Sequence, residues 1–341
     1  MPLSSLGAET SNPKKTIRVI VVDYDPVLAT HDGQRLTAYM HWQDPGLLSD
    51  LIAEDIGQAS GGLVEYQIVD FVRSDSFPLK KDGFRYDEAS YLAMWNDRSK
   101  AHQPDKISYK SIFYQFDLLR RLRELDAREI WLWGAPYFGF DEYAVKIPGD
   151  KIPYPTENPW FYRPYDIPDA GRTIWIMGWS YERGEGDALH SYGHRCEGML
   201  SLTVGKGLWD KKKNPRNIWN RYTHIAKDFP NDAQVGSVHF GPNSKRDYDY
   251  ADMDTVLSAA DDWYNYPFLT GAKLPLNASA WGGPDYGLNY QKWWLGHLPK
   301  APGQTDGFFN NWWRYIVDYD DALKYQPPPN ASFQKSIHAM R

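Results

Sequence analysis

The hydrophobic pattern in the first half of the chain predicts four buried strands. Nearly continuous apolar runs occupy residues 17–22, 64–71, 129–133 and 173–177. Each run has the length of a strand and is rich in β-branched or aromatic residues, which is typical of strands covered on both faces. Proline or glycine follows the first and third runs, and neither residue continues a strand well.

Helical spacing of apolar residues separates these runs. Asp44 and Pro45 form an N-cap followed by proline at the first helical position, and they precede an apolar stripe over residues 47–56. A second stripe predicts an amphipathic helix over residues 112–125. The order of strands and helices predicts an α/β fold with an open, mostly parallel sheet and flanking helices.

The pattern weakens from about residue 205 onward. Short helices are expected at residues 217–227, 253–263 and 308–324, separated by loops rich in Gly, Pro and Asn. We therefore expect a single catalytic domain over residues 16–325. It would consist of a sheet core (16–204) and an aromatic-rich, loop-rich half packed on the same core (205–325). Residues 1–15 and 326–341 are expected to be tails.

Composition narrows the classes of function. The formal net charge of the 341 residues is −6 with mixed signs, and the one basic run is residues 211–213. Because a nucleic-acid binder needs a broad basic face, nucleic acid is not an expected partner. No apolar run is long enough for a membrane helix. The single cysteine, Cys196, allows no intramolecular disulfide and is interpreted as a packing thiol.

The sequence leaves the cellular location of the protein open. Residues 1–15 are polar and contain no apolar signal segment, which fits a cytosolic protein or a secreted one without its signal. Asn277 and Asn330 each begin an Asn-Ala-Ser match to the N-glycosylation pattern, and such matches also occur by chance. An extracellular location is slightly favoured. The oligomeric state is not predicted.

The densest group of reactive side chains lies in residues 182–197, just after the fourth predicted strand. Asp187 is expected to cap a helix on which His190 and His194, four residues apart, project from the same face. Glu197 continues that stripe. Two imidazoles one turn apart are a common way to hold zinc or another divalent metal. His239 is the expected third ligand, with His297 as a reserve.

This helix resembles in part the zinc-binding helix of the His-Glu-x-x-His metallohydrolases. It departs from that pattern because Ser191, not Glu, follows the first histidine, and Gly193 precedes the second. A general base would therefore come from elsewhere, with Glu182, Glu185 and Glu197 as the available carboxylates. Two alternatives remain open: a polar site without metal, and a structural helix in which Arg195 pairs with a carboxylate.

Carboxylates at strand ends form a second candidate site. Asp23 and Asp25 follow the first strand, and Glu142 and Tyr137 follow the third. In open α/β sheets, sites gather at the carboxyl ends of the strands. With Glu182, these carboxylates are candidates for the acid and base of a glycosidase. Asp23 and Asp25 are also candidates for binding calcium, or for simple turn formation.

Aromatic residues make up 16% of the chain, with 15 Trp and 24 Tyr. Most are expected in the core, but Trp281 and Trp312, with Asn311, are candidates for binding sugar rings and hydroxyls. Our leading hypothesis is a metal-assisted hydrolase of a polysaccharide, oligosaccharide or similar hydroxyl-rich polymer, with Glu182, Glu197 and Arg195 as catalytic residues. The alternatives are a metal-free glycoside hydrolase and a non-catalytic glycan-binding protein.

Overall fold

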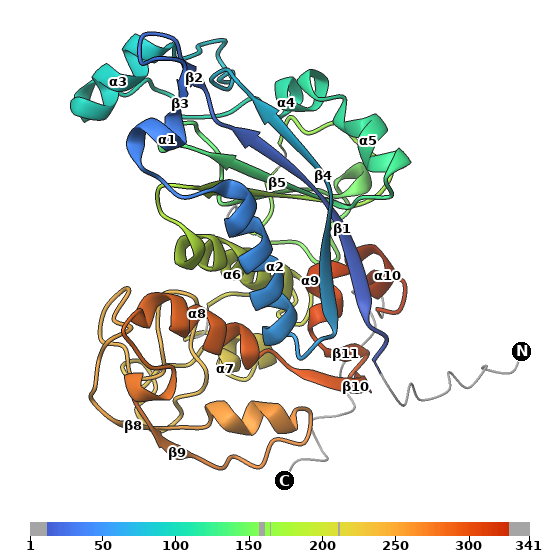
Figure 1. Ribbon diagram of the computed structural model, residues 1–341. Helices are drawn as coiled ribbons and strands as arrows, with labels where there is room; N and C mark the ends of the chain where they lie inside the picture. The colour runs from blue at the N-terminus through green and yellow to red at the C-terminus, as the bar shows by residue number, and fades with distance from the viewer. Residues whose placement is uncertain (1–11, 157–160, 164, 211, 327–341) are drawn as a thin grey trace, which may run out of the picture.

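A five-stranded, mostly parallel sheet forms the centre of the protein (Figure 1). The computed structural model describes residues 12–156, 161–163, 165–210 and 212–326. The strand order is β4-β1-β5-β7-β6, and every neighbouring pair is parallel except β6 with β7. The strands are β1 (Lys15–Tyr24), β4 (Val64–Ser74), β5 (Glu129–Gly134), β6 (Tyr143–Lys146) and β7 (Ile174–Ser180).

The predicted fold class and the four predicted strands are confirmed. Residues 19–22 of β1 and all of β5 are buried, as expected for central strands covered on both faces. The antiparallel edge strand β6 was not predicted. It has four residues, of which only Ala144 and Val145 are buried, so it leaves no apolar run in the sequence.

Helices cover both faces of the sheet (Figure 1). On one face, α2 (Pro45–Ala59) packs on β4 and α6 (Glu185–Leu202) packs on β7, while α8 (Tyr286–Gly296) packs on both helices. On the other face lie α4 (Tyr109–Gln115) and α5 (Leu118–Glu124). The predicted cap of α2 is confirmed, because the Asp44 carboxylate accepts a hydrogen bond from the Leu47 amide at 2.9 Å.

The single helix predicted over residues 112–125 is wrong in one respect. Asp117 adopts a left-handed conformation (φ 51°) and divides the segment into α4 and α5. The apolar periodicity continues across the break, so the sequence pattern does not reveal it. Smaller elements complete this half of the chain: β2 (Val27–Leu28), β3 (Gln34–Arg35), α1 (Leu36–Met40), α3 (Glu88–Asn96), η1 (Arg98–Lys100) and η2 (Pro148–Asp150).

Short elements joined by long loops make up the second half, as predicted, but two expected helices are wrong. Residues 253–263 form a strand and a 3-10 helix, and residues 308–324 form a strand followed by two short helices. The elements are α7 (Ile218–Tyr222), β8 (Val256–Ser258), η3 (Ala260–Asn265), β9 (Leu274–Leu276), η4 (Ala278–Ala280), β10 (Lys300–Thr305), β11 (Phe308–Asn311), α9 (Trp313–Val317) and α10 (Tyr319–Leu323).

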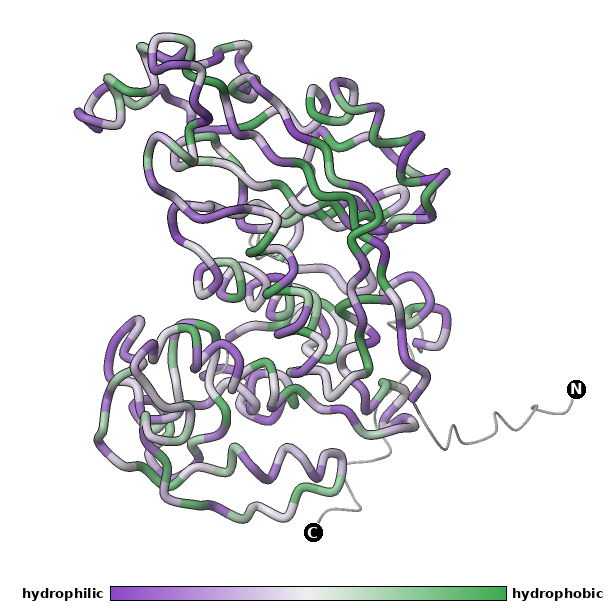
Figure 2. The backbone as a smooth tube through the Cα atoms, viewed as in Figure 1, coloured by the Kyte–Doolittle hydropathy of each residue, from purple (hydrophilic) through white to green (hydrophobic). Residues whose placement is uncertain are grey.

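One large cluster of buried hydrophobic residues draws on both halves of the chain, from Ile17 to Ala322. Figure 2 shows the hydrophobic residues concentrated along the central strands. In the second half, three tryptophans are fully buried, and each of their rings contacts the ring of Tyr222: Trp219, Trp263 and Trp312. Most of the aromatic residues therefore fill the core. Within the described ranges, every helix is too short or too polar for a membrane span.

Candidate metal centre

The helix α6 begins where the carboxyl end of β7 meets the helical layer. A short turn after Ser180 leads to Gly184, which takes the N-cap position with φ 79°. The prediction that Asp187 caps this helix is wrong, because α6 begins two residues earlier and Asp187 lies in its first turn. The expected placement of His190 and His194 one turn apart on this helix is confirmed, and their rings meet edge to face with 4.6 Å between centres.

The structure brings together His190, His194 and His239, the three residues that the sequence predicts as ligands. The Nε2 atom of His194 lies 3.0 Å from Nε2 of His190 and 3.0 Å from Nε2 of His239. In tetrahedral geometry, zinc–imidazole bonds of about 2.0–2.1 Å place neighbouring ligand nitrogens ~3.3–3.4 Å apart, close to the two separations seen here. The spacing of the three nitrogens therefore fits a shared metal ion, although metal binding itself stays a proposal.

Hydrogen bonds hold the segment that carries His239 against α6. The Val238 amide donates to Oε1 of Glu197 at 2.9 Å, and Nε2 of Gln291 donates to the Val238 carbonyl at 3.1 Å. The Tyr290 hydroxyl donates to the Ser237 carbonyl at 2.7 Å. These contacts come from α6 and α8, so the two halves of the chain fix the third histidine jointly.

Glu197 orients His194. Its Oε2 atom lies 2.9 Å from Nδ1 of His194, and its Oε1 atom accepts the Val238 amide. Burial acts to lower the pKa of His194, but the hydrogen bond and charge of Glu197 raise it overall. With the proton on Nδ1 and bonded to Glu197, Nε2 of neutral His194 presents its lone pair to the other two histidines. This carboxylate–histidine arrangement is typical of metal centres.

The environments of the other two histidines also suit ligands. Burial, followed by the charges of His194 and His239, lowers the pKa of His190 to about 3. His190 is therefore neutral at pH 7, which is the form that binds metal. On the other side of the centre, Oδ1 of Asp247 lies 3.5 Å from Nδ1 of His239. That carboxylate supports the same ring orientation, with Nε2 facing the centre.

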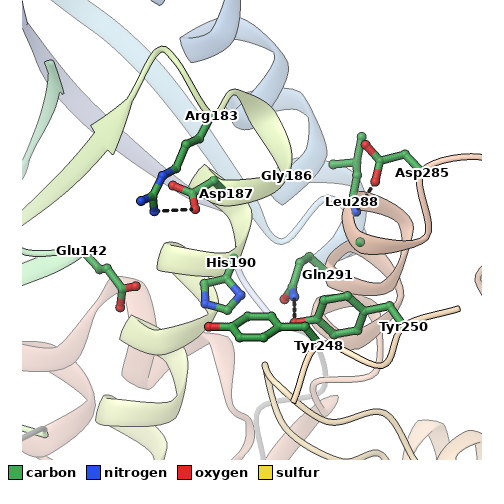
Figure 3. Close-up of a pocket in the computed structure, with 11 residues that line it drawn as sticks. Glu142, Arg183, Gly186, Asp187, His190, Tyr248, Tyr250, Asp285, Leu288 and Gln291 are labelled. Atoms are coloured by element: carbon green, nitrogen blue, oxygen red, sulfur yellow. Dashed lines mark hydrogen bonds and ion pairs between the residues drawn. The ribbon is translucent and has the colours of Figure 1, made fainter. Parts of the chain in front are cut away.

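A cleft of about 490 Å³ opens beside the histidines (Figure 3). Glu142 stands immediately before β6 and lines this cleft. Its main-chain carbonyl accepts a hydrogen bond from the Gly178 amide of β7, which holds this segment against the strand. Oε2 of Glu142 lies 3.8 Å from Nε2 of His194. The cleft is lined by Glu142, Arg183, Gly186, Asp187, His190, Tyr248, Tyr250, Asp285, Gly287, Leu288 and Gln291.

None of the three predicted catalytic residues lines this cleft, and Glu197 instead orients His194 behind it. Glu182 is outside its lining, with its carboxylate 3.9 Å from Arg183 and its side chain 33% exposed. Arg195 is fully buried and makes a two-pronged ion pair with Glu129 at 2.6 and 2.7 Å, so it is a structural residue. The alternative in which Arg195 pairs with a nearby carboxylate fits this contact, and the partner, Glu129, lies on β5.

The strand-end carboxylates occupy a separate part of the sheet edge. Asp23 is buried and bonds Nε of Arg73 at 2.6 Å; burial raises its pKa to about 6 against the opposing effect of Arg73. Asp25 accepts hydrogen bonds from the amide and hydroxyl of Thr37. Tyr137 lies near Arg98, whose guanidinium is 5.5 Å from its ring centre. Of this predicted group, the structure brings only Glu142 to the histidines.

The predicted sugar-binding aromatic residues are buried. Trp312 is fully buried, and Trp281 is 9% exposed with its indole N–H donating to the Tyr250 carbonyl at 2.7 Å. The Asn311 side chain accepts the Trp313 amide. His297, the reserve ligand, contacts the Trp293 carbonyl and Asp261. None of these four lines the cleft.

Sequence reasoning missed Tyr248, Tyr250 and Gln291, which line the cleft beside the histidines. Tyr248 and Tyr250 lie in a loop without helical or strand periodicity. The nearness of Tyr248 to His239, nine residues earlier, is the one local signal that could have indicated it.

We expect Glu197→Gln to weaken metal binding by about 10- to 100-fold, the usual effect of removing a partner that orients a ligand. A glutamine amide facing Nδ1 of His194 would donate a hydrogen bond, which would move the imidazole proton to Nε2 and block its lone pair. Isothermal titration with Zn²⁺ measures the change. Glu88→Gln is the matched control, because Glu88 forms a surface pair with Nδ1 of His31 at 2.6 Å. Equal losses in both variants would contradict the role of Glu197.

No protein family model, no curated protein sequence and no solved structure matches this chain.

Proposed function

We propose that the protein is a metal-dependent hydrolase. The observation that carries the proposal is the convergence of three imidazole Nε2 atoms, one of them oriented by Glu197, beside a cleft into which Glu142 reaches. Three protein ligands leave further coordination positions for water and substrate, as in catalytic zinc sites. Clustered titratable groups in a cleft are typical of enzymes, and they favour an enzyme over a glycan-binding protein.

A divalent metal at this centre would lower the pKa of a bound water toward neutrality and so supply a nucleophile. Glu142 is the general base that the geometry favours. Both oxygens of Glu197 are engaged by His194 and Val238, so Glu197 is not free to accept a proton from water. The Glu142 carboxylate is 56% exposed and 3.8 Å from Nε2 of His194, within reach of a water at the metal.

A hydroxyl-rich polymer remains the proposed substrate. The support comes from the residues that line the cleft, because the tryptophans predicted to bind sugars are buried. The lining of the cleft combines carboxylates (Asp187, Asp285), a guanidinium (Arg183), an amide (Gln291) and two phenols. Such groups bond hydroxyls, and the two tyrosine rings offer apolar faces. No contact in the described structure favours the metal-free glycosidase or a calcium site at Asp23 and Asp25, whose carboxylates are held by Arg73 and Thr37.

The test compares two candidate bases. Metal-loaded protein is first screened for hydrolysis against a panel of polysaccharides, acylated sugars, simple esters and peptides. We expect Glu142→Gln to reduce kcat by about 10²- to 10⁴-fold, the usual contribution of a general base. Glu182→Gln should retain activity, because the structure places Glu182 outside the cleft.

Metal content separates loss of the base from loss of the metal. Both variants should keep the wild-type metal stoichiometry in elemental analysis. A Glu142→Gln protein with full activity would overturn the role of Glu142. Wild-type protein that binds no metal would overturn the proposed function as a whole.

A further inference from the structure

Tyr248 has an unusual backbone conformation beside the candidate metal centre. Its φ angle is 59°, in the left-handed region that bulky residues rarely adopt. Its amide donates to the His239 carbonyl at 3.0 Å, which holds the loop in this shape. Such a conformation costs free energy and persists where the surrounding structure enforces it, often at functional sites.

Core packing does not explain the conformation, because the Tyr248 side chain is 56% exposed. Tyr250, two residues later, is the local comparison: it is 9% exposed, and its hydroxyl donates to the Val238 carbonyl at 2.7 Å. Tyr250 therefore serves packing and hydrogen bonding in the core. The Tyr248 ring lies against the rings of His239 and His190, at 4.6 and 5.6 Å between centres.

The hydroxyl of Tyr248 is directed at the centre. It lies 3.3 Å from Nε2 of His239, and Figure 3 shows it beside His190, with the Glu142 side chain reaching toward the same histidine from another segment. An oxygen bound to the same metal as His239 would stand ~3 Å from this nitrogen. The phenol O–H is thus placed to donate a hydrogen bond to an oxygen that enters the coordination sphere.

We propose that the cleft hydrolyses carboxylic esters or amides, and that Tyr248 donates a hydrogen bond to the oxygen of the reacting carbonyl. This inference rests on the proposed hydrolase function and names its substrate class. Water attacks the carbonyl carbon and gives its proton to Glu142, while the C=O π electrons move to the oxygen, where the Tyr248 hydroxyl stabilises the negative charge. A divalent metal held by His190, His194 and His239 would supply positive charge to the same oxygen. The intermediate collapses, the bond to the leaving nitrogen or oxygen breaks, and Glu142 returns the proton to that leaving group.

The same geometry does not suit glycosidic bonds. Their cleavage passes through a transition state of oxocarbenium character, with positive charge on the sugar, and two flanking carboxylates normally assist it. A metal cation and a phenol donor stabilise negative charge instead. If the substrate is a hydroxyl-rich polymer, the inferred target is therefore an acyl group carried by that polymer rather than the bond between its sugars.

The experiment uses full-length protein loaded with one equivalent of Zn²⁺, and acetohydroxamic acid as the probe, because its oxygens bind a metal and mimic a carbonyl that carries negative charge. We expect Tyr248→Phe to weaken binding of the probe about tenfold, which corresponds to ~1.4 kcal/mol. Tyr114→Phe, at an exposed tyrosine of α4 outside the cleft, should bind the probe as wild type does. Phenylalanine keeps the ring and meets the same backbone strain, so the Tyr248→Phe protein should fold normally.

A second measurement tests the bond that is cleaved. Hydrolysis of p-nitrophenyl acetate should fall about 10²- to 10³-fold in kcat in Tyr248→Phe, the usual loss on removing one oxyanion donor. p-Nitrophenyl glycosides should not be cleaved by any of the proteins. Unchanged probe affinity in Tyr248→Phe, or cleavage of a glycoside without cleavage of the ester, would overturn the inference.

The metal content, measured before the probe is added, distinguishes failure of the proposed function from failure of this inference. Protein that takes up no Zn²⁺ refutes the proposed function, and with it the inference. Protein that holds one equivalent of Zn²⁺ but shows no dependence on Tyr248 refutes the inference alone.

Discussion

The His194→Ala protein is expected to purify without bound metal and without hydrolytic activity. The Nε2 atom of His194 lies 3.0 Å from each of the other two candidate ligand nitrogens, so the change to alanine removes the central member of the group. It also leaves Glu197 without its histidine partner. Since losing a partner that only orients a ligand already costs about 10- to 100-fold in metal affinity, loss of the ligand should exceed ~100-fold.

Elemental analysis of protein purified without chelator or a nickel column measures the metal content, and titration with Zn²⁺ measures the affinity. His102→Ala is the matched control. The His102 side chain is 23% exposed, against 21% for His194, and it also pairs with a carboxylate, that of Asp82. Full metal content in His194→Ala would remove the basis for the proposed function.

The second large effect concerns stability. Arg195→Met is expected to lower the free energy of unfolding by about 3–5 kcal/mol, the usual cost of removing one partner of a buried ion pair. The change leaves the Glu129 carboxylate buried with neutral donors alone, the Tyr66 hydroxyl at 3.0 Å and the Trp131 indole N–H at 3.3 Å. The Arg195 guanidinium also lies over the Trp175 ring at 4.1 Å, and a methionine would replace part of that contact.

Chemical denaturation of single and double variants tests this assignment. The Arg195→Met/Glu129→Met double variant should recover most of the loss, because it leaves no unpaired buried charge. Arg120→Met, which removes an exposed pair with Asp117 and Glu124, should leave the free energy of unfolding nearly unchanged, because solvent screens that pair. An Arg195→Met protein of normal stability that has lost activity would contradict the structural role and return Arg195 to the catalytic site.

The sequence predicts those features that depend on local periodicity. Continuous apolar runs reveal the four long strands, and the i, i+4 spacing of His190 and His194 places two candidate ligands on one helix face. The sequence suggests His239 as a third ligand because histidine is a common ligand and this one lies in a short extended run between turn residues. Its meeting with α6 depends on hydrogen bonds from Gln291 and Tyr290, which no sequence pattern indicates.

The remainder of the site depends on how segments without periodicity pack. Glu142 and Glu182 both follow strands and carry the same chemistry, and only the antiparallel pairing of β6 with β7 brings Glu142 to the histidines. Arg195 looks catalytic because it adjoins His194. A helix turns by about 100° per residue, however, and Arg195 therefore faces the sheet and Glu129. Trp312 is a candidate for sugar binding from the sequence but is fully buried, and the amino-acid composition does not tell which tryptophans lie in the core and which at the surface.

The division of the centre between the two halves of the chain has a consequence for biosynthesis. A ribosome that has completed residues 1–204 has made every strand of the sheet and two of the three histidines, but His239 follows His194 by 45 residues. The segment that anchors His239 is held in turn by α8, which is translated later still. A nascent chain therefore lacks the third candidate ligand while its sheet forms, so a metal ion at the proposed centre would enter only a chain whose second half has already folded against the first.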